Sequence, residues 1–291
     1  MSIKNILVPV TTQKESESLL ETALVVAKNF NAHVTALHNH GYDDETLINA
    51  DSAGAQRYLN RDSYRQLVRA SRMYAQEQAE KARSRFDDLI AQMGISYSEE
   101  PKLNGATASW EGAIGGEAIV VAERGCIYDL IAVGHHGEDS SHWNPIVESA
   151  IFSTRRPVLL APPLSPDSVG ERILIGWNRS PQAGLAVACA MPFLEKAKAV
   201  RAFSVATRAK EGPGPEDIAR SLAWHGIDVE VVTAEPDRRS IGEMLLEQTQ
   251  SFDADLLVMG AYSHNRLREM ILGGVTKHVL SHANLPVLMV H

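Results

Sequence analysis

The chain has 291 residues, 44% of them hydrophobic and 22% charged, which suits a globular protein with one large domain or two ordinary ones. Its formal net charge of −8 argues against nucleic-acid binding, since a protein that contacts a phosphate backbone usually carries a basic surface. The sequence contains no apolar run of ~18 residues that could span a membrane, and no N-terminal signal segment. We therefore expect a cytoplasmic protein, with Cys126 and Cys189 as buried, reduced thiols.

Apolar runs and helical periodicities alternate along the first half of the chain. The runs are apolar at every position, which is typical of strands buried on both faces in a parallel sheet. Between them, apolar residues recur at steps of three and four, which indicates amphipathic helices. The expected elements are a strand at 5–10, a helix at 19–30, a strand that ends near 38–40, a helix at 64–93 that stops at Gly94, a strand-like stretch from 95, a helix around 112–124, and strands at 128–134 and 156–161 with a last helix between them.

The second half of the chain repeats the landmarks of the first half in the same order. The matching segments are 5–10 with 172–177, 128–134 with 254–260, and 156–161 with 285–290. The first helix of the second half is expected to begin at Ser180 and Pro181, because serine caps helix N-termini and proline suits the first helical position. Further helices are expected from 215 to Gly226 and over 241–252.

Each half therefore reads as β-α-β-α-β-α-β-α-β. This alternation predicts an α/β fold of two tandem, doubly wound, Rossmann-like domains with parallel sheets, flanking helices and right-handed crossovers. A proline-rich connection at 162–170 separates the two domains, which we place at residues 1–163 and 171–291.

A glycine-rich segment follows the strand expected at 254–260. It leaves the strand at Gly260, crosses a polar stretch, and reaches Gly273 and Gly274 at the expected start of the last helix, where Thr276 adds a hydroxyl group. Open α/β sheets bind ligands beyond the carboxyl ends of their strands, and a helix N-terminus offers unpaired N–H groups to an anion. This segment is therefore a candidate phosphate loop. The same glycines could instead only form turns, and the residue types alone leave both interpretations open.

The segment from Gly260 to Thr276 resembles the nucleotide loop of universal stress proteins, which has a glycine, two residues, a glycine, nine residues, a glycine and then serine or threonine. The aliphatic first strand, the Asp-Leu strand and the closing Pro-Val-Leu strand are also similar to that family. The resemblance covers nearly the whole chain. It implies a five-stranded parallel sheet per domain, ATP binding as in one branch of the family, and a pseudo-dimer of the two domains with 287–290 as a pairing edge.

The resemblance assigns the nucleotide site to the C-terminal domain. Gly260 and Gly273 match the first and third glycines of the motif, whereas Ser263 stands at the second, and Gly274 replaces the hydroxyl residue that usually follows the third. Asn178 stands where the family usually has an aspartate that faces the nucleoside. The implied nucleotide-binding residues are Asn178, Gly260, Ser263, Gly273, Gly274, Val275 and Thr276.

The corresponding loop of the first half departs further from the motif. It begins at Gly134 and is shorter, and Asn144 and Pro145 replace the glycine pair. Pro145 has no N–H to donate, and Glu138 and Asp139 would repel a phosphate. We expect the N-terminal domain to have a degenerate nucleotide loop.

Histidines of the first half suggest two further sites. His135, His136 and His142 lack the i, i+4 spacing of a helical metal site, so a polar surface is the favoured interpretation and no metal site is predicted. His38 and His40 lie on one face of a strand and could line a polar pocket, with a hydrated strand end as the ordinary alternative.

Taken with the resemblance, these features predict a universal stress protein with a stress-response or regulatory role. Its C-terminal domain would bind ATP or a related adenine nucleotide, accompanied by magnesium. No catalytic residues are identified, so at most slow ATP hydrolysis is expected. The alternative is a nucleotide-independent member that acts as an interaction scaffold, which the residues Asn178, Ser263 and Gly274 favour. No nucleic-acid or membrane partner is expected, and a homodimer of the tandem chain is left open.

Overall fold

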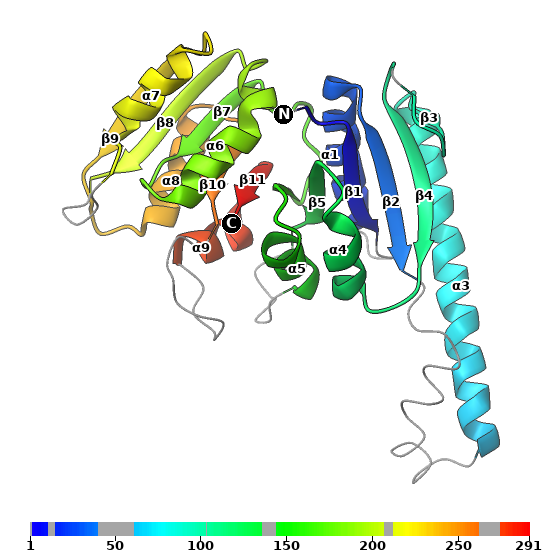
Figure 1. The fold of residues 1–291 in the computed structure, drawn as a ribbon. Helices are drawn as coiled ribbons and strands as arrows, with labels where there is room; N and C mark the ends of the chain where they lie inside the picture. The colour runs from blue at the N-terminus through cyan, green and yellow to red at the C-terminus, as the bar shows by residue number, and fades with distance from the viewer. Residues whose placement is uncertain are drawn as a thin grey trace.

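The computed structural model describes residues 2–10, 15–39, 61–102, 104–135, 144–206, 212–261 and 274–291. Within these residues, strands and helices alternate through both halves of the chain (Figure 1). The elements of the first half are β1 (Asn5–Val10), α1 (Glu15–Phe30), β2 (His33–Asn39), α3 (Arg61–Gln92), β3 (Ser96–Tyr97), β4 (Thr107–Ala113), α4 (Glu117–Gly125), β5 (Leu130–Gly134), α5 (Pro145–Ser153) and β6 (Val158–Ala161). Those of the second half are β7 (Arg172–Gly176), α6 (Pro181–Leu194), β8 (Ala199–Val205), α7 (Pro215–Ala223), β9 (Val229–Ala234), α8 (Ile241–Ser251), β10 (Leu256–Gly260), α9 (Gly274–His282) and β11 (Val287–Val290).

The strands form one continuous 11-stranded sheet in the order β3-β4-β2-β1-β5-β6-β11-β10-β7-β8-β9. Pairing is parallel within each half, and the order β4-β2-β1-β5-β6 of the first half corresponds to β9-β8-β7-β10-β11 of the second. Strand order reverses between β1 and β5 and again between β7 and β10, which is the doubly wound topology. The predicted fold class is confirmed.

The two halves join through their last strands, β6 and β11. These strands pair antiparallel, with Leu288 opposite Leu159. The predicted pairing edge at the C-terminal strand is therefore confirmed, and each half covers an edge that the other would leave open.

The aspartate of each Asp-Leu strand fixes the start of the first strand in its own half. The carboxylate of Asp129 accepts hydrogen bonds from the backbone N–H groups of Lys4, at 2.8 Å, and Asn5, at 3.1 Å. The carboxylate of Asp255 accepts from the N–H of Arg172 at 2.8 Å in the same way. This repeated contact is why both halves carry an aspartate just before a buried strand.

Two predictions about the first half are wrong in detail. The helix expected around 112–124 begins only at Glu117, because residues 107–113 pair with the whole of β2 and remain a strand. Cys126 is exposed at the C-terminal end of α4 rather than buried, whereas Cys189 is partly buried, and both thiols are free.

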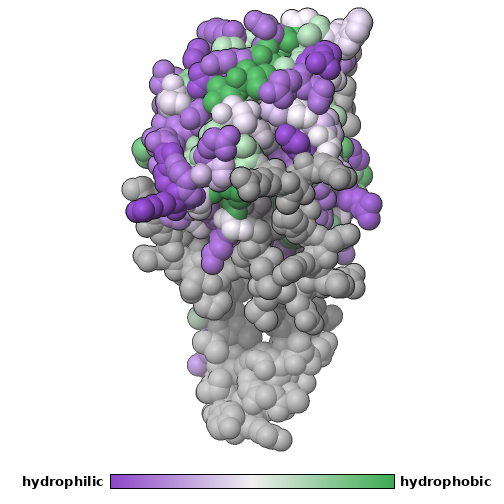
Figure 2. All heavy atoms as spheres, turned by 90° about the vertical axis from the view of Figure 1, so that its left-hand side faces the viewer, coloured by the Kyte–Doolittle hydropathy of each residue, from purple (hydrophilic) through white to green (hydrophobic). Residues whose placement is uncertain are grey.

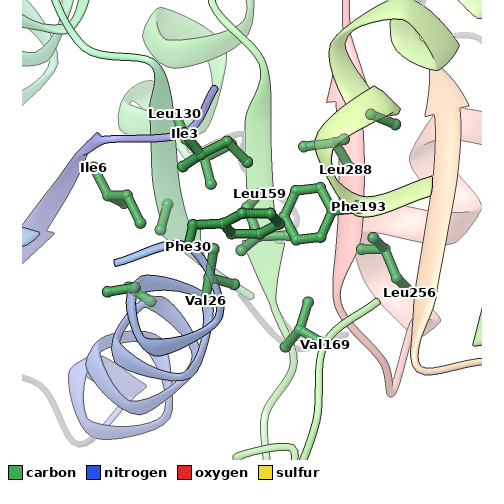
Figure 3. Packing of buried hydrophobic residues seen from close by; sticks show 14 of the residues in the cluster. Ile3, Ile6, Val26, Phe30, Leu130, Leu159, Val169, Phe193, Leu256 and Leu288 are labelled. Atoms are coloured by element: carbon green, nitrogen blue, oxygen red, sulfur yellow. The ribbon is translucent and has the colours of Figure 1, made fainter. Parts of the chain in front are cut away.

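Each face of the sheet carries one hydrophobic cluster, and each cluster includes residues of both halves. One face packs against α1, α3, α6 and α7, and the other against α4, α5, α8 and α9. At the junction the ring of Phe30, from α1, meets the ring of Phe193, from α6, edge to face with 4.8 Å between centroids (Figure 3). Because the core crosses the junction, the domain limits 1–163 and 171–291 stay a prediction.

The helices bear on the expectation that no segment of the chain spans a membrane. In the described part of the chain, no helix combines the length and the apolar character needed to cross a membrane.

Candidate functional site

The predicted site lies at the switch point of the second half, where strand order reverses between β7 and β10. Asn178 follows β7, Gly260 ends β10, and Gly274 begins α9. The structure thus brings the described members of the predicted site to the carboxyl edge of one sheet (Figure 1). Ser263 and Gly273 lie outside the described residues.

Asn178 supports the start of helix α6. Its side-chain oxygen Oδ1 accepts hydrogen bonds from the backbone N–H of Ser180, at 3.1 Å, and from the Ser180 hydroxyl, at 2.6 Å. Ser180 in turn caps α6, since its hydroxyl oxygen accepts from the N–H of Ala183 at 3.1 Å. The side-chain oxygen of Asn178 therefore supports the start of α6.

Gly260 lets the first turn of α6 lie directly over the end of β10. A side chain at this position would place its Cβ 2.5 Å from the backbone nitrogen of Ala183 and 2.7 Å from the carbonyl carbon of Gln182. No side chain fits between these backbones. In the same turn, the side-chain oxygen Oε1 of Gln182 is buried without a hydrogen-bond partner among the described residues.

In the first turn of α9, the first residue is exposed and the next two pack against the protein. Gly274 is exposed, and a Cβ added there would meet no described atom within 4 Å. Val275 packs against the hydrophobic cluster, and Thr276 is only 4% exposed. Gly274 is therefore the described residue of this turn with room for a ligand or a new side chain.

Trp177 supports this edge of the sheet, a role that was not predicted from the sequence. Its ring is 6% exposed, and its Nε1–H donates to the carbonyl oxygen of Pro213 at 2.9 Å, which ties the segment before α7 to the end of β7. Next to it, Arg179 has a positive φ of 61°, an uncommon conformation for a residue other than glycine. The signal available in the sequence was a large aromatic residue directly after a buried strand.

The equivalent edge of the first half is built differently. Helix α5 is capped by Asn144, whose side-chain oxygen accepts from the N–H of Ile146 at 2.8 Å, and Pro145 takes the first helical position. The Asn144 side chain therefore takes up the N–H of Ile146, a donor that an anion at the helix N-terminus would otherwise bind. The cap supports the interpretation of this loop as degenerate, although residues 136–143 lie outside the described residues.

Among the described residues, His38 contacts a backbone carbonyl and an aromatic ring. It is buried, its Nδ1 lies 3.2 Å from the carbonyl oxygen of Val10, and its ring stacks on Trp110. A small hollow near the ends of β1 and β2 has room for about one water molecule, and burial there raises the pKa of the Glu117 carboxyl above its usual range. The other predicted member of the polar pocket, His40, lies outside the described residues.

Comparisons with known proteins agree with this geometry. A model described as the universal stress protein family matches residues 2–145 and 171–291. Universal stress protein A of Yersinia pestis is 26% identical over 176 residues, which are 59% of this chain and 99% of that protein. The crystal structure of a universal stress protein from Archaeoglobus fulgidus has a TM-score of 0.65 and 17% identity, over 98% of this chain and 97% of that one.

A second solved structure, of a protein of unknown function from Pseudomonas aeruginosa PAO1, has a TM-score of 0.56 and 16% identity, over 99% of this chain and 92% of that one. At such identities, the two structural likenesses show the fold alone. The family model, in contrast, matches most of both halves of the sequence. This chain therefore belongs to the universal stress protein family.

Proposed function

We propose that the second half of the chain binds ATP or a related adenine nucleotide and that the protein has a stress-response or regulatory role. The observation that carries this proposal is the open first turn of α9, which begins at Gly274 beside the switch point of the sheet. Backbone N–H groups at a helix N-terminus bind phosphate through hydrogen bonds and the helix dipole. Magnesium would accompany the phosphates, as it does for most bound nucleoside triphosphates.

The roles of the individual residues follow from their places in the second half. The N–H groups of Gly274, Val275 and Thr276 would meet the phosphates, while Asn178 would face the nucleoside. Gly260 would act indirectly, by keeping the capped start of α6 close to the loop. Ser263 and Gly273 complete the proposed loop. Dedicated catalysis is not part of the proposal, and hydrolysis would be slow at most.

A nucleotide-independent scaffold is the second candidate function, and the contacts of Gly260 favour it. The approach of α6 accounts for that glycine without any phosphate. The hydrogen bonds of the Asn178 oxygen to Ser180 likewise serve the fold itself. Calorimetry with ATP and mass spectrometry of the native protein separate the two candidates. The scaffold predicts no binding heat and no co-purifying nucleotide.

Substitutions of Gly274 test the phosphate contact most directly, since the position has room for them. Gly274→Ser restores the hydroxyl of the family motif and is expected to tighten ATP binding about three- to tenfold through one hydrogen bond to a charged group. Gly274→Asp is expected to weaken binding about tenfold or more by repulsion. An aspartate in a first helical turn is favourable, so Gly274→Asp should unfold at no lower temperature than the wild type.

The matched control is Gly274→Asn, which has the size of the aspartate without its charge. Calorimetric titration with ATP gives the affinities, and thermal unfolding monitored by circular dichroism checks the fold. If the serine, asparagine and aspartate variants bound ATP with equal affinity, the first turn of α9 would not be in contact with the phosphates.

Asn178→Asp tests the nucleoside end of the proposed site. The aspartate can still accept both hydrogen bonds from Ser180, so the start of α6 is retained. A carboxylate beside a ribose hydroxyl or adenine amino group is expected to tighten ATP binding about three- to tenfold, because hydrogen bonds to charged groups are the stronger ones. Inorganic tripolyphosphate is the control ligand, and its affinity should not rise. A gain shared by both ligands, or a gain for neither, would contradict the role given to Asn178.

A further inference from the structure

Helix α9 carries two histidines one turn apart, His278 and His282. Their rings stack, with 4.2 Å between centroids and 13° between planes. Residues four apart on a helix lie on the same face, and a histidine pair at this spacing is a recurrent part of zinc sites. His135, His136 and His142 of the first half lack this spacing, and the pair on α9 was not predicted from the sequence.

The protein orients both rings. Nδ1 of His282 lies 2.9 Å from the backbone carbonyl oxygen of His278. Because a carbonyl oxygen only accepts, Nδ1 carries the proton and the lone pair of the neutral ring is on Nε2. An N–H donated to a backbone carbonyl is the usual support of a metal-binding histidine.

His278 packs closely against α8 because Gly242 has no side chain. A Cβ on Gly242 would lie 2.8 Å from the Cβ of His278 and 2.9 Å from two of its ring atoms. In the first half, the equivalent positions are Ala118 and Ser149, and the Ser149 hydroxyl donates to the Ala118 carbonyl oxygen at 2.6 Å. The histidine and the glycine that accommodates it therefore distinguish the second half.

The charges around the pair favour a cation. Glu243, on α8, faces His278, and its carboxyl pKa is lowered mainly by hydrogen bonds from Ser240 and further by His278 and Arg239. Arg239, which also acts on Glu243, is itself paired with Asp237 and Glu247. Lys277 is the exposed cation next to His278 on α9.

We propose that His278 and His282 bind one divalent transition-metal ion, of the class of Zn²⁺, Ni²⁺ or Cu²⁺, through one imidazole nitrogen each. Water would complete the coordination, and no group of three or more metal-binding side chains occurs among the described residues. With two protein ligands the site depends on both histidines, and it forms whether or not a nucleotide binds.

Metal titration of the full, tag-free chain tests this site. Equilibrium dialysis and calorimetry with Zn²⁺ are expected to show one metal equivalent fewer for His278→Ala and for His282→Ala than for the wild type. The matched control is His225→Ala, which removes an exposed histidine near the end of α7 and should keep the full count. Histidines elsewhere add the same background to every variant, so the difference in count is the measured quantity.

Spectroscopy gives a second readout that a structural role would not affect. Electron paramagnetic resonance of the Cu²⁺-loaded wild type should show hyperfine coupling to two imidazole nitrogens, and either variant should lose that signal. His282→Gln, which keeps a polar side chain on the exposed surface, serves where the alanine variant folds poorly. Metal counts and spectra that are the same in the wild type and in all variants would overturn the proposal.

Discussion

Phe193→Ala is expected to lower the free energy of unfolding by about 4 kcal/mol, within the ~3–5 kcal/mol range of buried phenylalanine truncations. The Phe193 side chain is 1% exposed and lies where the two halves meet. Its ring contacts the ring of Phe30 edge to face (Figure 3). A Cβ added at Gly170 would lie 2.8 Å from Cδ1 of Phe193. Gly170 has a positive φ of 90°, a conformation that glycine adopts without strain.

Chemical denaturation followed by circular dichroism measures this loss. The matched control is Leu185→Ala, on the same helix but 47% exposed, which should cost less than about 1 kcal/mol. Because both hydrophobic clusters cross the junction, the wild type should unfold in a single transition. A loss below about 1 kcal/mol for Phe193→Ala would mean that this junction contributes little to stability.

Much of the fold was predictable because its strands are buried on both faces. Residues 6–10 are apolar throughout and lie in β1, and 172–177 corresponds to β7. The segment 107–113 gave no such signal, since Ser109, Glu111 and Gly112 interrupt any apolar run. Its strand conformation follows from seven residues of pairing with β2, which is a tertiary contact. Local pattern is a weak guide where long-range pairing decides the structure.

The candidate site was predictable in its place and less so in its contacts. Spacing along the sequence placed Asn178, Gly260 and Gly274 at one edge of the sheet, because parallel strands end together there. The hydrogen bond from Trp177 to Pro213 joins residues that no periodicity relates. The close contact of Gly260 with α6 depends in the same way on how two elements pack, so the sequence indicated a glycine loop without revealing this second reason for the glycine.

Gly260→Ala is expected to destabilise the protein by about 3 kcal/mol, at the upper end of the usual cost of overfilling a packed site. The new Cβ would lie 2.5 and 2.7 Å from backbone atoms of α6, so no rotamer change can relieve the clash and the whole first turn of the helix must shift. That turn carries the Ser180 cap and adjoins Asn178, so the shift should also weaken ATP binding.

Gly184→Ala on the same helix is the control for Gly260→Ala, because a Cβ there meets no described atom within 4 Å and should raise stability by about 0.5–1 kcal/mol. Denaturation gives both stability changes, and calorimetry at a temperature where Gly260→Ala stays folded gives its ATP affinity. A Gly260→Ala protein as stable as the wild type would show that α6 can withdraw from β10. A folded variant that is destabilised but binds ATP at full strength would assign Gly260 to packing alone, and the phosphate contacts would then rest on the first turn of α9 and the proposed loop before it.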